Sequence, residues 1–224
     1  EDKGDGDYTL VVDHKNIAPC MDQATVAIED KDFYKHGGIS ISGIVRALLS
    51  NAQGNAVQGG STLTQQLIKQ VFFRDEATKR GLAGIPRKIK EIILAVEVER
   101  MYSKEQILGL YLNESPYGGR RNGVESAAQT YFGKSSKDLN LSECTLLAAI
   151  PNNPSAYNPY NIAGRNALLA RQRKVIDNMV EMKYISKEQA NQAKSVAIMD
   201  TVKPLADQYS NVKAPHFVQM VKEQ

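Results

Sequence analysis

The stretch PRKIKEIILAVEVER, residues 86–100, gives the clearest indication of the fold of this 224-residue chain. Its apolar residues recur at the three- and four-residue spacing of an α-helix, and Pro86 suits a first helical turn. We therefore expect a helix over residues 86–102. Glu91 points away from the main apolar stripe toward a face that is also partly apolar, so both sides of this helix should be covered. The main stripe consists of Ile85, Ile89, Ile92, Ile93 and Val96.

Helical spacing continues on both sides of this stretch. Further helices are expected at residues 22–34, 40–51, 61–73, 103–112, 122–131, 142–149, 164–182 and 186–194. Ser103 and Ser186 each precede a glutamine at the capping-box position, which favours a helix start there. Only residues 8–12 alternate in the way a short strand does. The fold is therefore predicted to be mainly α.

The chain divides most simply into two parts. Residues 1–21 form an N-terminal tail with the short strand, and residues 22–224 form one domain. Within that domain a core at residues 22–159 carries all the unusual residue patterns, and the polar helices of residues 160–224 are interpreted as a supporting lobe. The proline-rich loop at residues 151–159 is the best boundary between them.

Composition excludes several classes of protein. With 42% hydrophobic and 24% charged residues the chain should be globular, and a net charge of +3 is too small to indicate a nucleic-acid partner. No run approaches the roughly 20 apolar residues that cross a bilayer, and no signal-peptide pattern is present. We expect any membrane anchor to lie outside these residues. Basic residues gather between positions 69 and 90: Lys69, Arg74, Lys79, Arg80, Arg87, Lys88 and Lys90.

The two cysteines, Cys20 and Cys144, lie far apart and match neither a zinc-site spacing nor a CxxC motif. One disulfide between them is possible. Cys144 stands in the apolar stretch LSECTLLAA, where a small buried side chain packs well, and this favours two buried free thiols.

Glu29 is the first candidate for chemistry, in the stretch EDKDFYKHGG of residues 29–38. It ends an apolar run, so its carboxyl should be half-buried. Burial disfavours the ionised form of a carboxyl, a property that a general base or acid uses. The alternative is an ordinary acid at a helix end, paired with Lys31 or Lys35. Spacing alone leaves both interpretations open.

The second candidate is the stretch QGGSTLTQQLIK, residues 58–69, which joins a glycine turn to a helix start. This arrangement is typical of an anion-binding site, because backbone N–H groups of the first turn face the ligand. Lys69 follows two turns later with a positive charge. An ordinary helix cap explains the hydroxyls equally well. The side chains that could contact an anion are Ser61, Thr62, Thr64, Gln65 and Gln66.

Glu91 is a second candidate acid. Arg87 and Lys88 lie one turn before it on the same helix and should keep it ionised. Glu29 has no comparable pair of cations beside it on a helical face. Two carboxylates in different environments indicate two different roles.

Taken together, these stretches resemble the peptidoglycan glycosyltransferases of class A penicillin-binding proteins and their monofunctional relatives, the family 51 glycosyltransferases. The resemblance covers residues 24–159. The first motif is matched by Glu29, Asp30, Phe33 and His36, and the second runs from Gly59 and Gly60 to Gln66. The third is matched by Arg87, Lys88 and Glu91, and the fourth by residues 104–113 with Tyr111 and Asn113. Residues 123–134 and 146–159 continue the likeness.

Two departures from the family pattern are visible. Gly109 stands where the fourth motif usually has a glutamate, and residues 114–121, ESPYGGRR, differ from the usual aromatic stretch. Neither departure touches Glu29 or Glu91.

The resemblance implies an inverting hexosyltransferase that polymerises lipid II into glycan strands. Glu29 would take the proton from the 4-hydroxyl of the acceptor sugar as that oxygen attacks the anomeric carbon of the growing chain, and undecaprenyl pyrophosphate would leave. Glu91 would organise the cations or help to hold a divalent cation, Mg²⁺ or Mn²⁺. The residues expected at the pyrophosphate are Ser61, Thr62, Gln65, Gln66, Lys69, Arg87 and Lys88. Those expected to support the motifs are Asp30, Phe33, His36, Gly59, Gly60, Tyr111 and Asn113.

The resemblance also implies a lysozyme-like fold, with a head lobe and a smaller jaw lobe that faces the membrane. Residues 41–49 and 71–73 are apolar candidates for the jaw, although core packing explains them equally well. The place of work would be the extracytoplasmic face of the bacterial cytoplasmic membrane. Expected partners are lipid II, the growing glycan chain, the membrane surface and a transpeptidase domain after residue 224; nucleic acid is not among them.

Two other functions stay open. A lysozyme-like or lytic enzyme would also use a half-buried glutamate in a helical fold, but it would cut an existing glycan and need no pyrophosphate site. A binding module without catalysis would use the same residues as caps and ion pairs.

Overall fold

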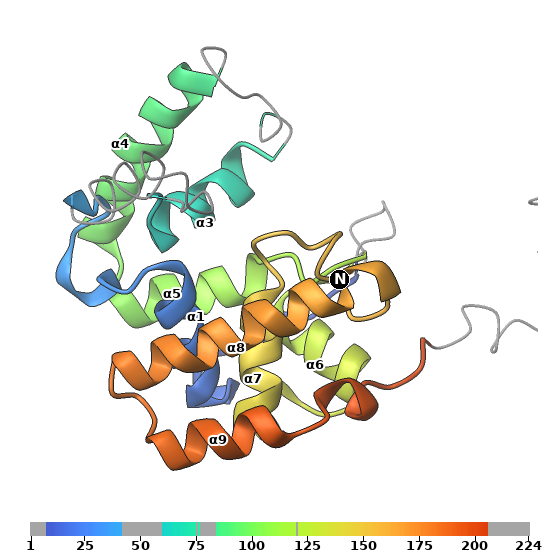
Figure 1. The fold of residues 1–224 in the computed structure, drawn as a ribbon. Helices are drawn as coiled ribbons and strands as arrows, with labels where there is room; N and C mark the ends of the chain where they lie inside the picture. The colour runs from blue at the N-terminus through green and yellow to red at the C-terminus, as the bar shows by residue number, and fades with distance from the viewer. Residues whose placement is uncertain (1–7, 42–59, 75, 77–83, 120, 206–224) are drawn as a thin grey trace, which may run out of the picture.

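The computed structural model describes residues 8–41, 60–74, 76, 84–119 and 121–205. In these ranges the chain is mainly helical, as the sequence predicted, and the strands are two residues each (Figure 1). The longer helices are α1 (Pro19–Glu29), α3 (Leu63–Phe72), α4 (Ile85–Met101), α5 (Lys104–Glu114), α6 (Val124–Phe132), α7 (Leu141–Ala149), α8 (Arg165–Glu181) and α9 (Lys187–Ser195). Short 3-10 turns are η1 (His14–Asn16), η2 (Phe33–Lys35), η4 (Ser136–Asp138), η5 (Ile162–Gly164) and η6 (Ile198–Thr201).

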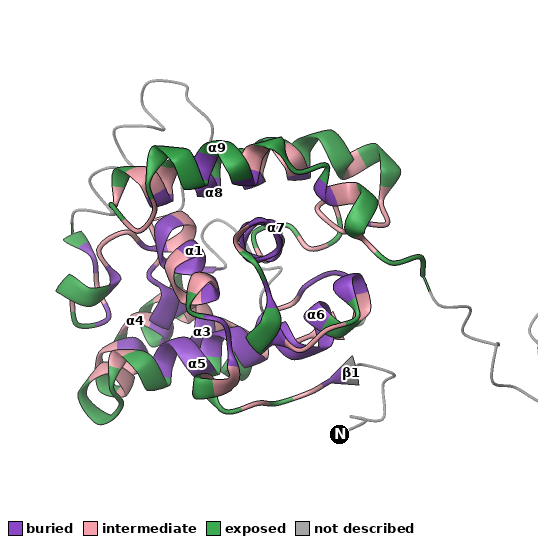
Figure 2. Cartoon of the chain, turned by 90° about the horizontal axis from the view of Figure 1, so that it is seen from below, coloured by how far each residue is buried: buried purple, intermediate pink, exposed green. Residues whose placement is uncertain are grey.

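Helix α7 lies at the centre of the fold. Every residue from Ser142 to Ala149 is buried, and α1 and α8 both pack against it (Figure 2). Helix α9 lies outside α8 and keeps its outer face exposed. The core that results reaches from α1 to α8, so the C-terminal helices complete the same core as the motif-bearing ones.

Helices α3 and α4 pack against each other, and α3 joins the core through Leu63 and Leu67 and through its packing on α5 (Figure 1). The prediction that both sides of α4 are covered is wrong. Ile85, Ile89 and Ile93 are 50%, 53% and 58% exposed, whereas Glu91 and Ala95 on the other face are buried. The helix therefore turns its charged motif inward against α3 and leaves the isoleucine stripe outside.

The N-terminal strand is shorter than predicted. β1 (Tyr8–Thr9) pairs in parallel with β2 (Arg121–Asn122), and side chains take over the backbone hydrogen bonds directly after it. The Leu10 N–H donates to the Ser126 hydroxyl, and the Asn113 side chain both accepts from and donates to the backbone of Val12. Because these bonds come from helices, no third strand residue is needed to hold the segment.

Helix α1 ends at Glu29, five residues before the predicted end at residue 34. Asp30 leaves the helical conformation, with φ −156° and ψ 80°, and its carboxylate accepts a hydrogen bond from the Leu63 N–H at 3.0 Å. This long-range bond replaces the next turn of helix. The predicted helix at residues 40–51 lies almost wholly outside the described residues, as does Gly59.

Cys20 and Cys144 form a disulfide, so the prediction of two free thiols is wrong. The bond joins the second residue of α1 to the middle of α7, and Cys144 is fully buried. The prediction of burial for Cys144 was correct, but packing alone gave no sign that the partner helix would bring Cys20 within reach.

Gly109, the first departure from the family pattern, has a local cause. A Cβ at this position would lie 3.0 Å from the His14 Cβ, and the His14 ring is held by Asp22 at 2.9 Å. A longer side chain at residue 109 would displace His14, so the glycine and the histidine belong together.

Candidate active site

A cleft of about 1320 Å³ lies between the α3–α4 pair and the core helices. Glu29 lines it, as do Ser61, Gln65, Gln66, Lys69 and Glu91 from the sequence-predicted set. The structure therefore brings together residues from three separate stretches of sequence. It adds one wall that the sequence did not predict, formed by α8.

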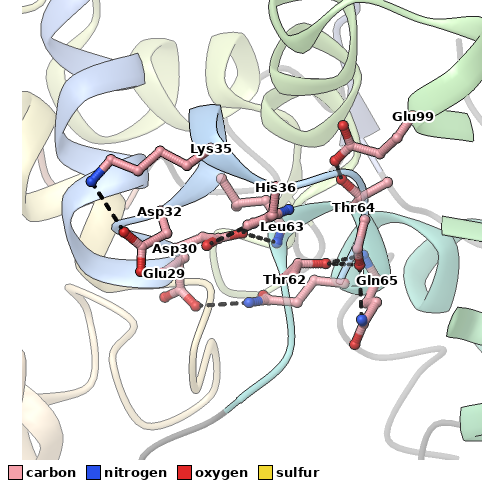
Figure 3. Close-up of polar contacts among 12 residues, drawn as sticks. Glu29, Asp30, Asp32, Lys35, His36, Thr62, Leu63, Thr64, Gln65 and Glu99 are labelled. Atoms are coloured by element: carbon pink, nitrogen blue, oxygen red, sulfur yellow. Dashed lines mark hydrogen bonds and ion pairs between the residues drawn. The ribbon is translucent and has the colours of Figure 1, made fainter. Parts of the chain in front are cut away.

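The carboxylate of Glu29 is held by two donors from different helices. Gln66 on α3 donates its amide to Oε2 at 3.1 Å, and Arg171 on α8 donates to Oε1 at 2.7 Å (Figure 3 shows Glu29 and the loop beside it). The side chain is 9% exposed. Glu29 is thus more deeply buried than predicted, and its cation partner is Arg171, whereas Lys31 and Lys35 pair with Glu181 and Asp32.

Tyr111 fixes the orientation of Gln66. Its hydroxyl donates to Oε1 of Gln66 at 3.2 Å, which leaves the Gln66 amide nitrogen to face Glu29. Complete burial raises the pKa of Tyr111 well above its ordinary value, and the nearby Glu29 charge adds to this effect. The phenol therefore stays protonated and remains a donor at any working pH.

Asp30 and His36 connect the first motif to the second. The His36 ring lies 2.9 Å and 3.1 Å from the two carboxylate oxygens of Asp30, and Asp30 also accepts from the first residue of α3 (Figure 3). Both side chains are buried, at 8% and 5% exposure. They connect the two motifs and do not line the cleft.

Thr62 and Gln65 bind the backbone of the first motif from the other side. The Thr62 hydroxyl and the Gln65 amide each donate to the Gly38 carbonyl at 2.9 Å, and Thr62 also caps α3. Gly38 has a φ of +86°, and a Cβ there would lie 2.8 Å from the Ala95 backbone. A glycine is required where these three segments meet.

Lys104 connects the fourth motif to the same framework. Its ammonium donates to the His36 carbonyl and pairs with Glu99, both at 2.6 Å, and it lies 4.4 Å from the centre of the buried Phe33 ring. Thr64 donates to the other oxygen of Glu99 (Figure 3). Phe33 therefore supports the site through a cation–π contact and not by contact with a ligand.

Glu91 is 2% exposed and is neutralised on its own helix. Arg87 donates to one of its oxygens and Lys88 to the other. Lys88 also reaches Ser61 Oγ at 2.7 Å and Gln65 Oε1 at 2.9 Å. Burial lowers the pKa of Lys88, an effect that the Glu91 charge opposes. The third motif thus delivers a positive charge to the start of α3.

Lys69 is the cation best placed to meet a ligand on the α3 wall. It lines the cleft and has no hydrogen bond or ion pair with another described residue. Lys88 and Lys69 are close enough for their charges to interact. Together they make this wall of the cleft a place for an anion.

In the part of the chain that the structure describes, the side chains do not form a protein-built site for a divalent cation. Both oxygens of Glu91 already accept from cations, and the described residues hold no cluster of three or more acidic, histidine or cysteine side chains. A hard cation such as Mg²⁺ takes several free oxygen ligands. The two carboxylate oxygens of Glu91 are already occupied by hydrogen bonds from Arg87 and Lys88.

The sequence does not indicate Arg171 as a site residue, because the pattern of α8 is that of an ordinary amphipathic helix. Its buried face is Leu168, Gln172, Val175, Ile176 and Met179. The cleft face carries residues at three- and four-residue spacing, Arg171, Lys174, Asn178, Glu181 and Met182. Only the position of α8 beside α1 distinguishes this polar face from a solvent-exposed one.

Asn113, the remaining residue of the fourth motif, lies away from the cleft. It binds the backbone of Val12 and of Gly109, so its role is to hold the N-terminal segment on α5. Gly60 precedes Ser61 and is partly buried.

Among the described residues no helix has the length and apolar character needed to cross a membrane.

A family model and the similar curated proteins both place this chain in one family. The family model described as "Transglycosylase" matches residues 3–180. Penicillin-binding protein 1A of Clostridium botulinum (strain Langeland / NCTC 10281 / Type F) is 39% identical over 192 residues, which cover 82% of this chain and 22% of that protein. Penicillin-binding protein 1A of Aquifex aeolicus (strain VF5) is 43% identical over 202 residues, which cover 89% of this chain and 26% of that protein. The chain thus spans about a quarter of the length of these relatives or less.

The fold is similar to that of a solved structure. Penicillin-binding protein 1A from Haemophilus influenzae aligns with 97% of this chain and 21% of its own, with a TM-score of 0.53 and 22% sequence identity. At that identity the match concerns the fold alone.

Proposed function

Because the chain belongs to the transglycosylase family of class A penicillin-binding proteins of the 1A type, we propose that it is a peptidoglycan glycosyltransferase that polymerises lipid II. It would be an inverting hexosyltransferase, with residues 22–159 as the catalytic core. The observation that carries the proposal is the position of Glu29. Its carboxylate, 9% exposed, lies in a cleft whose α3 wall presents Lys69, and Lys88 of α4 binds Ser61, which also lines this cleft, so that a base and an anion site lie in one groove.

The chemistry requires one proton transfer and one displacement. Glu29 takes the proton of the acceptor 4-hydroxyl, the oxygen forms a bond to the anomeric carbon, and the bond from that carbon to the pyrophosphate breaks with its electron pair. Because the transfer is a single displacement, it inverts the anomeric centre and forms no covalent sugar intermediate.

The leaving group needs positive charge more than it needs a proton. Lys69 is available to bind the pyrophosphate directly, and Lys88 presents its ammonium beside Ser61. Glu91 orients Lys88 and Arg87, so its role in this proposal is to organise cations. Fixed charges of this kind stabilise the developing negative charge without reorganisation. Mg²⁺ or Mn²⁺, if used, would be bound chiefly by the pyrophosphate.

The same cations argue against a lytic enzyme. A glycan-cleaving enzyme activates water beside a neutral sugar chain and has no leaving phosphate to neutralise. Lys69 lies on α3 three residues after Gln66, which binds Glu29, so a cation and the base line the same cleft.

We assign the two parts of the lysozyme-like fold to a head lobe, centred on α7, and a smaller jaw lobe, α3 with α4. The exposed large apolar residues of α3 and α4 are Val71, Phe72, Ile85, Ile89, Ile93 and Met101. We propose that this surface meets the outer leaflet of the bacterial cytoplasmic membrane, where both lipid-linked substrates reside. The candidate region at residues 42–49 lies outside the described residues, and a transpeptidase domain after residue 224 stays part of the proposal.

The direct test is incubation of the purified protein with lipid II in detergent, followed by gel separation of the glycan. Lengthening strands that a muramidase digests are the expected result. If lipid II is recovered unchanged while purified glycan strands are shortened, the lytic alternative replaces this proposal.

A further inference from the structure

Helix α8 is fixed beside the end of α1 by three side-chain contacts. Arg171 binds Glu29, Asn178 donates to the Ala27 carbonyl at 2.9 Å, and Lys31 binds Glu181 at 2.5 Å. These bonds set the position of α8 along α1. The same face of α8 forms a wall of the cleft, which Arg171, Asn178 and Glu181 line together with Lys174.

Arg171 itself is held from three directions. Its Nε donates to the Ala149 carbonyl at the end of α7 at 3.1 Å, its Nη2 donates to Glu29, and the guanidinium lies 6.0 Å from the centre of the Tyr157 ring. The side chain is 17% exposed. A guanidinium bound in this way has little freedom, so it fixes the carboxylate that it contacts.

We propose that Arg171 is a positioning residue for the general base, and that it assigns different roles to the two oxygens of Glu29. This inference rests on the proposed function. Oε1 accepts a charge-assisted hydrogen bond from Arg171, which makes it the poorer proton acceptor. Oε2, whose described donor is the neutral amide of Gln66, is the oxygen that takes the proton from the acceptor hydroxyl.

Arg171 provides the positive charge that pairs with this 9% exposed carboxylate, and together with Gln66 it fixes the plane of the carboxylate between α3 and α8. Since Arg171 acts on the base and not on the pyrophosphate, its loss should lower kcat and leave KM for lipid II nearly unchanged.

The experiment compares Arg171→Ala, Arg171→Lys and Arg173→Ala in the full chain with lipid II as substrate. Arg173 is an exposed arginine two positions along the same helix with no described partner, so it serves as the matched control. We expect kcat of Arg171→Ala to fall about 10²-fold, as a misplaced catalytic group does. Arg171→Lys should keep an intermediate kcat, and Arg173→Ala should behave as wild type.

Rescue separates positioning from a purely structural role. Millimolar guanidinium chloride should restore part of the kcat of Arg171→Ala and leave Arg173→Ala unchanged, because the free cation can occupy the emptied site. Equal kcat in Arg171→Ala and Arg173→Ala overturns the inference, as does a loss confined to KM or one that guanidinium does not rescue in a folded protein. A wild-type protein that leaves lipid II intact overturns the proposed function first.

Discussion

The amide nitrogen of Gln66 lies 3.1 Å from Oε2 of Glu29, a contact between the second motif and the first. Tyr111 from the fourth motif holds the other end of the Gln66 amide. The base is therefore oriented by two neutral side chains on one side and by Arg171 on the other.

Glu29→Gln should abolish most of the turnover and leave substrate binding intact. The amide has nearly the shape of the carboxylate but cannot take a proton, and loss of a general base costs about 10²–10⁴-fold in rate. Polymerisation rate and lipid II binding are measured in parallel, with Glu188→Gln on the exposed side of α9 as the control. A Glu29→Gln enzyme with a wild-type rate contradicts the assignment.

Lys69→Ala and Arg87→Ala should differ in stability, although both lower rate and affinity. Lys69 has no described partner to lose. Arg87 is bonded to the 2% exposed Glu91, and a buried acceptor deprived of a donor costs about 1–3 kcal/mol. Thermal unfolding should therefore separate the two variants, with Lys187→Ala as a surface control. Unchanged lipid II affinity in Lys69→Ala would show that this lysine does not meet the pyrophosphate.

Lys88→Arg should extend activity to higher pH. Burial lowers the pKa of Lys88, so its neutral form becomes favoured, and its charge is lost, at a lower pH than for an ordinary lysine. Arginine stays charged over the whole range. The alkaline side of the pH–rate profile is therefore expected to move upward in Lys88→Arg but not in Lys187→Arg. Superimposable profiles would mean that Lys88 does not limit the rate at alkaline pH.

Removal of the disulfide should destabilise the fold without changing the site. The bond closes a sequence separation of 124 residues, and loss of a native disulfide typically costs about 2–5 kcal/mol. The double variant Cys20→Ala with Cys144→Ala should unfold at lower denaturant concentration than the oxidised wild type. Reductant should lower the midpoint of the wild type alone. If reductant leaves the wild-type midpoint unchanged, the bond does not contribute to stability.

The double variant Phe72→Ser with Ile89→Ser should bind lipid vesicles less well. Phe72 is 63% exposed and Ile89 53%, and burying one such side chain is worth about 1.5–3 kcal/mol. At least a tenfold loss of partition into anionic vesicles is expected by co-sedimentation. Ile162→Ser, at a 79% exposed position before α8, is the control. Equal losses in both variants would place the membrane contact elsewhere.

Most of the helices could be predicted because each has a local signal. The capping boxes at Ser103 and Ser186 are present, and the helices begin at the next residue. The end of α1 could not be predicted, because Asp30 leaves the helix to bind the backbone of Leu63, far along the chain. Local spacing carries no information about such a bond.

The site was predictable where a motif holds both partners. Glu91 with Arg87 and Lys88 is one turn of a single helix, and its ion pairs follow from spacing. Arg171 was not predictable from its own stretch, because its partner Glu29 is 142 residues away. The exposure of the α4 isoleucines could not be predicted either, because periodicity shows that a helix face is apolar but not whether another element covers it.

The disulfide between Cys20 and Cys144 makes that part of the chain a covalent macrocycle. Glu29, Lys69 and Glu91 all lie within the ring, whereas Arg171 lies outside it. One backbone cut inside the ring leaves a single covalently continuous molecule on a non-reducing gel. A cut between residues 145 and 164 instead separates α8 from the ring, so the base and its arginine would remain together only by non-covalent packing.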